Sequence, residues 1–236
     1  KKLKEYEEKA LKAEKASKMK SLFLGGYTLR VTENPNQAVL SLAQAENLAE
    51  ELGDDFFAGL CCRDMANVFS ESFSEKEFLA NAIKAYDFFV KAGRRVHADY
   101  TLILLGNAYA QNGLDDDAEA CYSQAISIAE ETGDTLLLAQ GTRDYAVLIA
   151  EKEPRLAISL FERVTRELQY DMESGSLAYW ARACALVGNR ESFLELIGKA
   201  ESLALDAHSQ YVVNYQKFHS YKALSDESAA VEAIQK

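Results

Sequence analysis

The sequence has few prolines and glycines and no long apolar run. Two prolines and 12 glycines among 236 residues are too few to separate the many short strands of an all-β fold. No apolar stretch approaches the roughly 18 residues that a membrane span needs. The run at 101–105, for example, ends at Gly106 and Asn107. We therefore expect a helical chain that does not insert into a membrane.

Positive charge is also scarce. The chain has 26 Lys and Arg against 37 Asp and Glu, a formal net charge of −11. A field of this sign repels phosphate backbones and anionic lipid surfaces. Direct binding to nucleic acid is therefore not expected, and the partner that we expect is a protein or a peptide.

Residues for catalysis or metal binding are few and scattered. Of the three histidines, His97, His208 and His219, no two stand four residues apart, and none lies near a cysteine at metal-ligand spacing. Neither a glycine-rich phosphate loop nor a Gly-x-Ser-x-Gly elbow occurs. We expect no enzyme activity, no cofactor and no metal.

The four cysteines lack the spacing of a disulfide scaffold. Because each falls on an apolar face of a predicted helix, we expect free and buried thiols at Cys61, Cys62, Cys121 and Cys184. Free thiols favour a cytoplasmic location. The chain begins at Lys1 rather than at Met, as a piece of a longer protein would. A membrane-tethered or periplasmic full-length protein therefore stays open, and the compartment is unknown.

An internal repeat organises the sequence. Glycines recur every 40 residues, at Gly53, Gly93 and Gly133. The first and the third belong to the same phrase, Ala-Glu-Glu-Xaa-Gly-Asp, at 49–54 and 129–134. Both prolines, Pro35 and Pro154, stand three residues before an alanine. Since proline suits the first turn of a helix and glycine the residue after its end, these marks predict a repeating helix–turn–helix unit.

The best-preserved unit covers residues 99–133. Its first helix carries Leu105, Gly106 and Tyr109, and its second helix carries Ala118, Tyr122 and Ala125. This pattern resembles the tetratricopeptide repeat, with Leu-Gly-x-x-Tyr in helix A and Ala-x-x-x-Phe-x-x-Ala in helix B. The resemblance extends from about Ser21 to the end of the chain. Units of 40 residues are longer than the standard unit and are similar to those of bacterial regulators and sensors.

The resemblance implies an all-α fold, a right-handed solenoid of helix–turn–helix repeats. We predict one domain over residues 1–236, made of about six helix pairs, with the N-terminal helix 1–18 as a cap. The lysine-rich face of that helix is expected to be solvated.

In the tetratricopeptide family, helix A of each unit lines a concave surface that binds peptides. Some members hold a carboxylate with side chains three residues before and one residue after the Gly position. The side chains in those slots here are Arg63, Asn67, Asn107, Arg143 and Arg182. Arginine offers two parallel hydrogen bonds to a carboxylate, and asparagine can bond a peptide backbone. Ile103 and Val147 depart from the pattern. Alternatively, the arginines pair with carboxylates of adjacent units.

We therefore expect a non-catalytic scaffold or sensor module of a larger bacterial-type protein, whose concave groove binds an extended, acidic segment. A local cationic groove on an acidic chain would select such a segment. The alternative is a structural module that self-assembles, for example as a homodimer, and has no peptide ligand. Replacing Arg63 or Arg143 by alanine is expected to leave folding intact.

Overall fold

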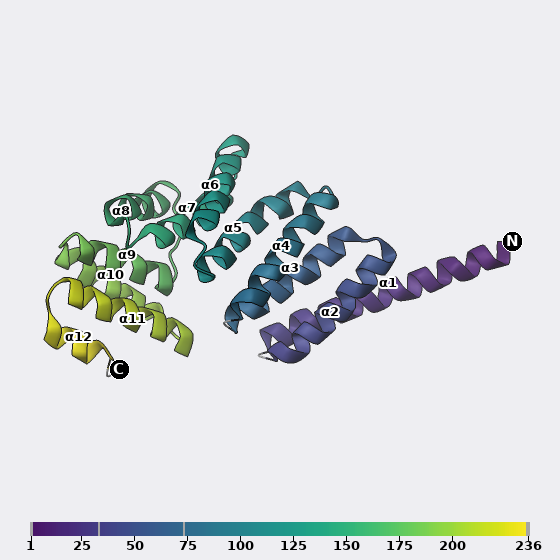
Figure 1. Cartoon of the computed structure of the whole chain (residues 1–236), viewed down its shortest axis with the longest axis horizontal. Coiled ribbons are helices and arrows are strands. Elements are labelled where there is room, and N and C mark those ends of the chain that lie inside the picture. The colour runs from purple at the N-terminus through teal and green to yellow at the C-terminus, as the bar shows by residue number, and fades with distance from the viewer. Residues whose placement is uncertain (1, 33, 73, 235–236) are drawn as a thin grey trace. The chain divides into compact units, whose positions relative to one another are not determined.

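The computed structural model describes residues 2–32, 34–72 and 74–234. Within these ranges the chain forms α-helices joined by short connections, one π-helical segment and no strand (Figure 1). The elements are α1 (Lys2–Val31), α2 (Pro35–Leu52), α3 (Asp55–Glu71), α4 (Glu75–Lys91), α5 (Arg95–Gln111), α6 (Asp115–Thr132), α7 (Thr135–Ile149), α8 (Pro154–Glu162), η1 (Arg163–Glu167), α9 (Ser174–Leu186), α10 (Arg190–Leu203), α11 (Ala207–Ala223) and α12 (Glu227–Ile234).

The chain divides within α6 into two compact units, unit 1 (Lys1–Cys121) and unit 2 (Tyr122–Lys236). In unit 1, α1 to α5 each pack on the next helix along the chain, and the start of α6 adds Cys121 to the core of α3, α4 and α5. In unit 2, α7 to α12 pack in the same sequential way, and α9 also contacts α7 and α11. The predicted all-α fold of helix–turn–helix repeats is confirmed, while the single domain stays a prediction.

The repeated Gly-Asp pair ends one helix and begins the next. Gly53 and Gly133 have φ angles of 70° and 72°, in the left-handed region that glycine adopts without steric cost. The side chains of Asp54 and Asp134 then each accept a hydrogen bond from the amide three residues on, at 3.1 and 3.0 Å. These caps satisfy amides that the helix itself leaves unpaired. The glycine spacing therefore marked true helix boundaries.

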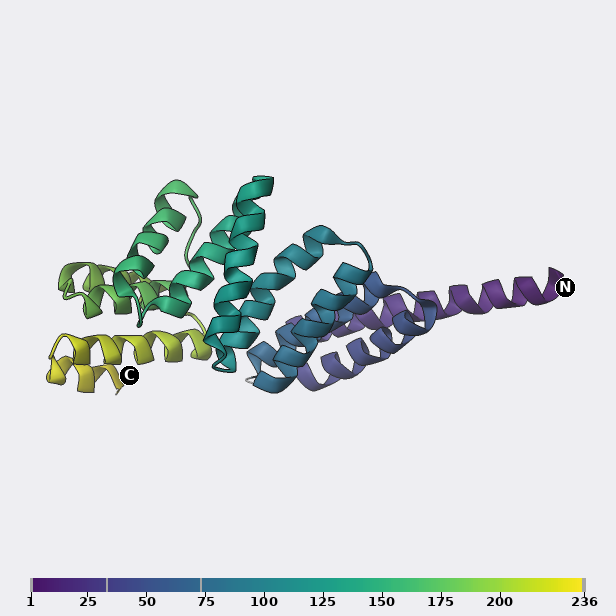
Figure 2. The ribbon, with the colours of Figure 1, turned by 45° about the horizontal axis from the view of Figure 1, so that its top comes forward.

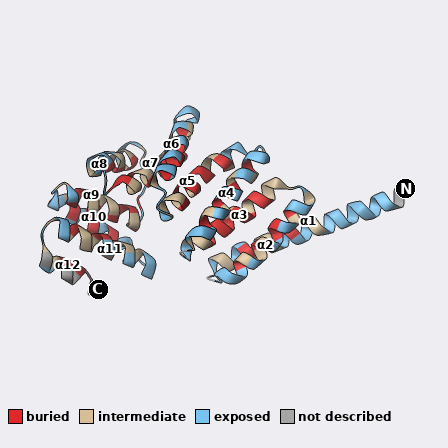
Figure 3. Cartoon of the chain, viewed as in Figure 1, coloured by how far each residue is buried: buried red, intermediate tan, exposed pale blue. Residues whose placement is uncertain are grey.

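The N-terminal helix does not end at residue 18. It continues as α1 to Val31, because no proline interrupts it and Gly25 and Gly26 are accommodated inside it. Its residues 4–14 are exposed, and this part of the helix extends beyond α2, whereas packing begins near Met19, which is 1% exposed (Figures 1, 2 and 3). A Cβ atom at Gly26 would lie 2.7 Å from the Leu42 side chain. The missing side chain thus lets α1 and α2 approach closely.

Small residues form much of the core, as the repeat predicts. The first alanine of the helix B pattern is fully buried in four of the repeats, at Ala38, Ala82, Ala118 and Ala157. Buried residues follow the faces between neighbouring helices (Figure 3). All four cysteines are free and buried, as expected. None of the described helices is long and apolar enough to cross a bilayer.

Candidate functional site

Two of the predicted binding residues line a common cavity in unit 1. Arg63 and Asn67 lie one turn apart on α3 and border a cavity of about 390 Å³. The other lining residues come from α4 and α5: Phe89, Val96, His97, Tyr100, Thr101 and Leu104. Apart from His97, Arg63 is the only residue with an acidic or basic side chain among the described residues that line the cavity.

Aromatic packing holds His97 against this cavity. Its ring lies 5.2 Å from that of Phe89 and 5.0 Å, edge to face, from that of Phe56. Burial lowers the pKa of His97, and the positive charges of Arg63 and Arg94 lower it further. Both effects favour the neutral imidazole at pH 7. The cavity therefore combines an apolar aromatic wall with the guanidinium of Arg63.

Arg63 forms an ion pair that leaves part of its surface exposed. Its Nε and Nη2 atoms lie 3.4 and 3.2 Å from Oδ1 of Asp64. The Asp64 carboxylate is nearly buried, and its Oδ2 atom has no hydrogen-bond partner among the described residues. The Arg63 side chain is 35% exposed. Arginine has five N–H donors, so the pair with Asp64 leaves donors for a ligand.

The two predicted asparagines lie on different helices of unit 1. Asn67 is half-buried, and its side chain has no hydrogen-bond partner among the described residues. Asn107 lies on α5 and is also half-buried, but it does not line the cavity. The structure therefore brings Asn67, but not Asn107, to the cavity of Arg63.

Arg143, on α7 of unit 2, is enclosed by partners. Its Nε atom lies 2.6 Å from Oδ1 of Asp144, and its Nη1 atom lies 3.1 Å from Oε2 of Glu173 and 3.2 Å from the Tyr170 hydroxyl. Burial alone would lower the pKa of this guanidinium, but the hydrogen bond and charge of Asp144, with the charge of Glu173, raise it. The side chain is 14% exposed. Its contacts link α7 to the connection that precedes α9.

Arg182, on α9, is enclosed in a similar way. It lies 3.4 Å from Glu151 and donates a hydrogen bond to the carbonyl oxygen of His219 on α11. All three predicted arginines pair with carboxylates, but among the described residues Arg63 does so only with Asp64 on its own helix, whereas Arg143 and Arg182 reach carboxylates outside theirs. The groove shared by Arg63, Asn67, Asn107, Arg143 and Arg182 stays a prediction.

The sequence interpretation missed the α5 side of the cavity. Val96, Tyr100 and Leu104 recur at four-residue intervals, and His97 and Thr101 follow them by one residue. This spacing places them on one helical face, which is the signal that could have identified them. What the spacing does not indicate is that α3 places Arg63 opposite this face.

No family model and no curated protein sequence matches the chain. Its fold is similar to that of a Rap protein complexed with competence and sporulation factor, with a TM-score of 0.69 and 13% identity over 93% of this chain and 62% of that chain. It is also similar to NprR in complex with its cognate peptide NprX, with a TM-score of 0.69 and 15% identity over 96% and 68% of the two chains.

A third similar structure carries the repeat in its description. It is a Podosopora anserina kinesin light chain of nearly identical TPR-like repeats, with a TM-score of 0.61 and 17% identity over 79% of this chain and 95% of that chain. The chain has a tetratricopeptide-like repeat fold. It spans less than two thirds of the length of the Rap protein.

Proposed function

We propose that this tetratricopeptide-like chain is a non-catalytic peptide- or protein-binding module of a larger bacterial-type protein. The cavity of Arg63 and Asn67 is its anchor for an extended, acidic segment. The similar Rap and NprR structures contain a bound peptide or factor, which supports a binding role for the fold. The observation that carries the proposal is the partly exposed Arg63 beside an apolar cavity.

The lining chemistry supports a segment with an acidic side chain next to an apolar one. Arg63 can bond a carboxylate, and Asn67 can bond the peptide backbone one helical turn away. Val96, which is exposed, and the half-buried Leu104 offer apolar surface to the neighbouring side chain. The neutral form of His97, which burial favours, adds no second positive charge beside Arg63.

The test compares two acetylated, amidated hexapeptides, Ala-Leu-Glu-Glu-Leu-Ala and its Gln-Gln counterpart, by calorimetry with the whole chain. We expect the acidic peptide to bind at least tenfold more tightly at low salt and to weaken as salt is added. Asn67→Ala should weaken binding about 2–10-fold, the loss of one hydrogen bond. Asn47→Ala, a matched change at an exposed site on α2, should have no effect.

Equal binding of the two peptides, or an Asn67→Ala variant that binds as the unchanged chain does, would overturn the proposal. Self-association in sedimentation experiments, without binding of either peptide, would replace it by the self-assembly alternative. Asn67→Ala suits this test better than Arg63→Ala, because removing Arg63 also leaves the buried Asp64 without its cation.

A further inference from the structure

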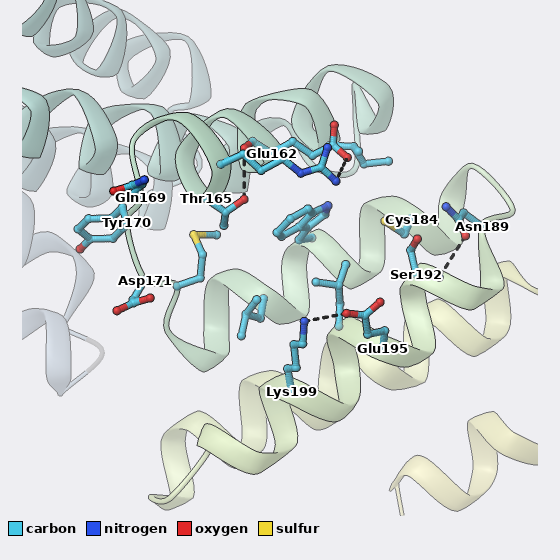
Figure 4. Close-up of a pocket in the computed structure, with 16 residues that line it drawn as sticks. Glu162, Thr165, Gln169, Tyr170, Asp171, Cys184, Asn189, Ser192, Glu195 and Lys199 are labelled. Atoms are coloured by element: carbon cyan, nitrogen blue, oxygen red, sulfur yellow. Dashed lines mark hydrogen bonds and ion pairs between the residues drawn. The ribbon is translucent and has the colours of Figure 1, made fainter.

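Unit 2 contains a second and larger cavity that the predicted arginines do not line. Its volume is about 600 Å³, within the roughly 300–1,000 Å³ of typical ligand sites. It lies between α8 with η1 on one side and α10 on the other, over α9, as the close-up shows (Figure 4). Gln169, Tyr170 and Asp171 gather at one end, and Asn189 and Ser192 at the other.

The cavity faces away from the α9 surface that carries Arg182. Leu177, Trp180 and Cys184 of α9 line it. At about 100° of rotation per residue, Arg182 lies about 200° from Trp180, on the opposite face of the helix. A ligand in this cavity would therefore not contact Arg182. This cavity also shares no described lining residue with the cavity of Arg63 and Asn67.

Trp180, which stacks on a buried ring behind it, forms part of the cavity wall. The Trp180 ring lies 5.6 Å from that of the fully buried Phe161, nearly parallel to it at 21°. Trp180 itself is half-buried, and its indole N–H has no partner among the described residues. The face of an indole attracts a cation within about 6 Å more strongly than other aromatic rings do. The wall thus accepts both apolar and cationic groups.

The residues that line the cavity include one more carboxylate than cations. Its two cations are already paired, Arg166 with Glu162 at 3.5 Å and Lys199 with Glu195 at 2.7 Å, each pair four residues apart in the sequence. Asp171 is exposed, lines the cavity and has no ion-pair partner among the described residues. A ligand with one positive charge would complement this rim.

The backbone beside Asp171 is irregular. α8 continues into the π-helical segment η1, and Gln169 then has a φ angle of 51°. The left-handed region is sterically unfavourable for residues other than glycine, and π-helical turns are frequent at functional sites. This irregular path brings residues 169–172 to the end of the cavity.

We propose that this cavity binds a segment of a partner protein in which an arginine or lysine is flanked by apolar side chains. The basic side chain lies on Trp180 and pairs with Asp171, and the apolar neighbours contact Leu177 and Leu196. The polar groups at both ends of the cavity suit the backbone of such a segment rather than a small free cation.

The test uses Trp180 as its reporter, because it is the only tryptophan of the chain. Acetylated, amidated pentapeptides Ala-Leu-Xaa-Leu-Ala, with Xaa as arginine, lysine, norleucine or glutamate, are titrated into the whole chain. We expect a saturable change of tryptophan emission with the arginine and lysine peptides. Their affinity should exceed that of the norleucine and glutamate peptides at least tenfold. Ethylguanidine alone should bind at least tenfold more weakly than the arginine peptide.

A pair of variants separates the carboxylate from the overall charge. Asp171→Asn should lower the affinity for the arginine peptide at least threefold and leave the affinity for the norleucine peptide unchanged. Glu131→Gln removes the same charge at an exposed position on α6 and should change neither. The proposal would be overturned if the basic peptides caused no saturable change of tryptophan emission. It would also be overturned if the norleucine peptide or ethylguanidine bound as tightly as the arginine peptide. The same holds if Asp171→Asn behaved like Glu131→Gln. None of these results bears on the acidic peptide of unit 1.

Discussion

Arg63 in unit 1 and Arg143 in unit 2 hold the same position in two repeats, 80 residues apart, but their surroundings differ. Each lies on a helix that begins after a closing glycine and a capping aspartate, and each pairs with the aspartate that follows it. Arg143 also pairs with Glu173, and its side chain is 14% exposed against 35% for Arg63. One arginine borders a cavity, and the other is enclosed.

The connection after the next helix explains this difference. In unit 1, residues 92–94 join α4 directly to α5. In unit 2, residues 168–173 join η1 to α9, and this longer path supplies both Glu173 and Tyr170 to Arg143. The repeat thus places an arginine at the same position of both helices. The connection decides whether that residue is available to a ligand.

The largest effect is expected where the arginine is enclosed. Arg143→Ala should lower the free energy of unfolding by about 3–5 kcal/mol, because it breaks the largely buried ion pair with Asp144 and also removes the pair with Glu173. Urea denaturation followed by Trp180 fluorescence reports on unit 2. Arg155→Ala, at an exposed position of α8, is the control and should change stability by less than about 0.5 kcal/mol. If the two variants were equally stable, Arg143 would not have the structural role that its contacts indicate.

A smaller loss is expected in unit 1. Arg63→Ala should cost about 1–3 kcal/mol, since Asp64 loses its hydrogen-bond donor while water reaches the partly exposed site. The sequence alone led us to expect no loss, because it does not show that Asp64 is buried. Denaturation followed by circular dichroism measures the change, with the exposed Arg95→Ala as control. If Arg63→Ala lowered the free energy of unfolding as much as Arg143→Ala does, the two arginines would not differ in their structural roles.

The thiols should behave alike in both units. Burial, with the charges of Glu46 and Asp64, raises the pKa of Cys61 to about 12, and burial with Glu162 raises that of Cys184 to about 11. Above the ordinary pKa of 9.0, the unfolded chain loses these protons while the folded chain keeps them. Stability should therefore fall as the pH rises above 9, by about 1.4 kcal/mol per pH unit for each thiol.

Removing either thiol should reduce that slope. Unfolding measured between pH 8 and pH 10.5 should show a shallower decline for Cys61→Ala and for Cys184→Ala than for the unchanged chain. The readout is the slope, so a general loss of stability from the smaller side chain does not obscure it. A slope that stays the same in Cys61→Ala but falls in Cys184→Ala would show that the two units bury their thiols differently.

Much of the fold could be predicted because helix ends are encoded locally. The closing glycines, the capping aspartates and the buried alanines act within a few residues of their own position. The end of α1 was harder to predict. No proline or other stop signal stands at Ser17 or Lys18, and the helix continues past them to pack against α2.

The candidate site was predictable only in part. The repeat register identified Arg63 and Asn67 as neighbours on one helical face, and both line the cavity. It also selected Asn107, which does not line that cavity. The register names a position in each repeat, but it does not show which opposing side chains complete a site there.

The sequence by itself determined the helices, their pairing into repeats and the small residues between them, because these depend on neighbours within one or two helical turns. Only the tertiary structure decided that Asp64 is buried, that Glu173 encloses Arg143 and that Trp180 borders a cavity. These features depend on contacts between residues that are far apart in the chain, or on which face of a helix its neighbours leave open. Burial determines how much free energy is lost when a charge has no partner, because a charge removed from water must be paired. The local sequence does not specify that partner.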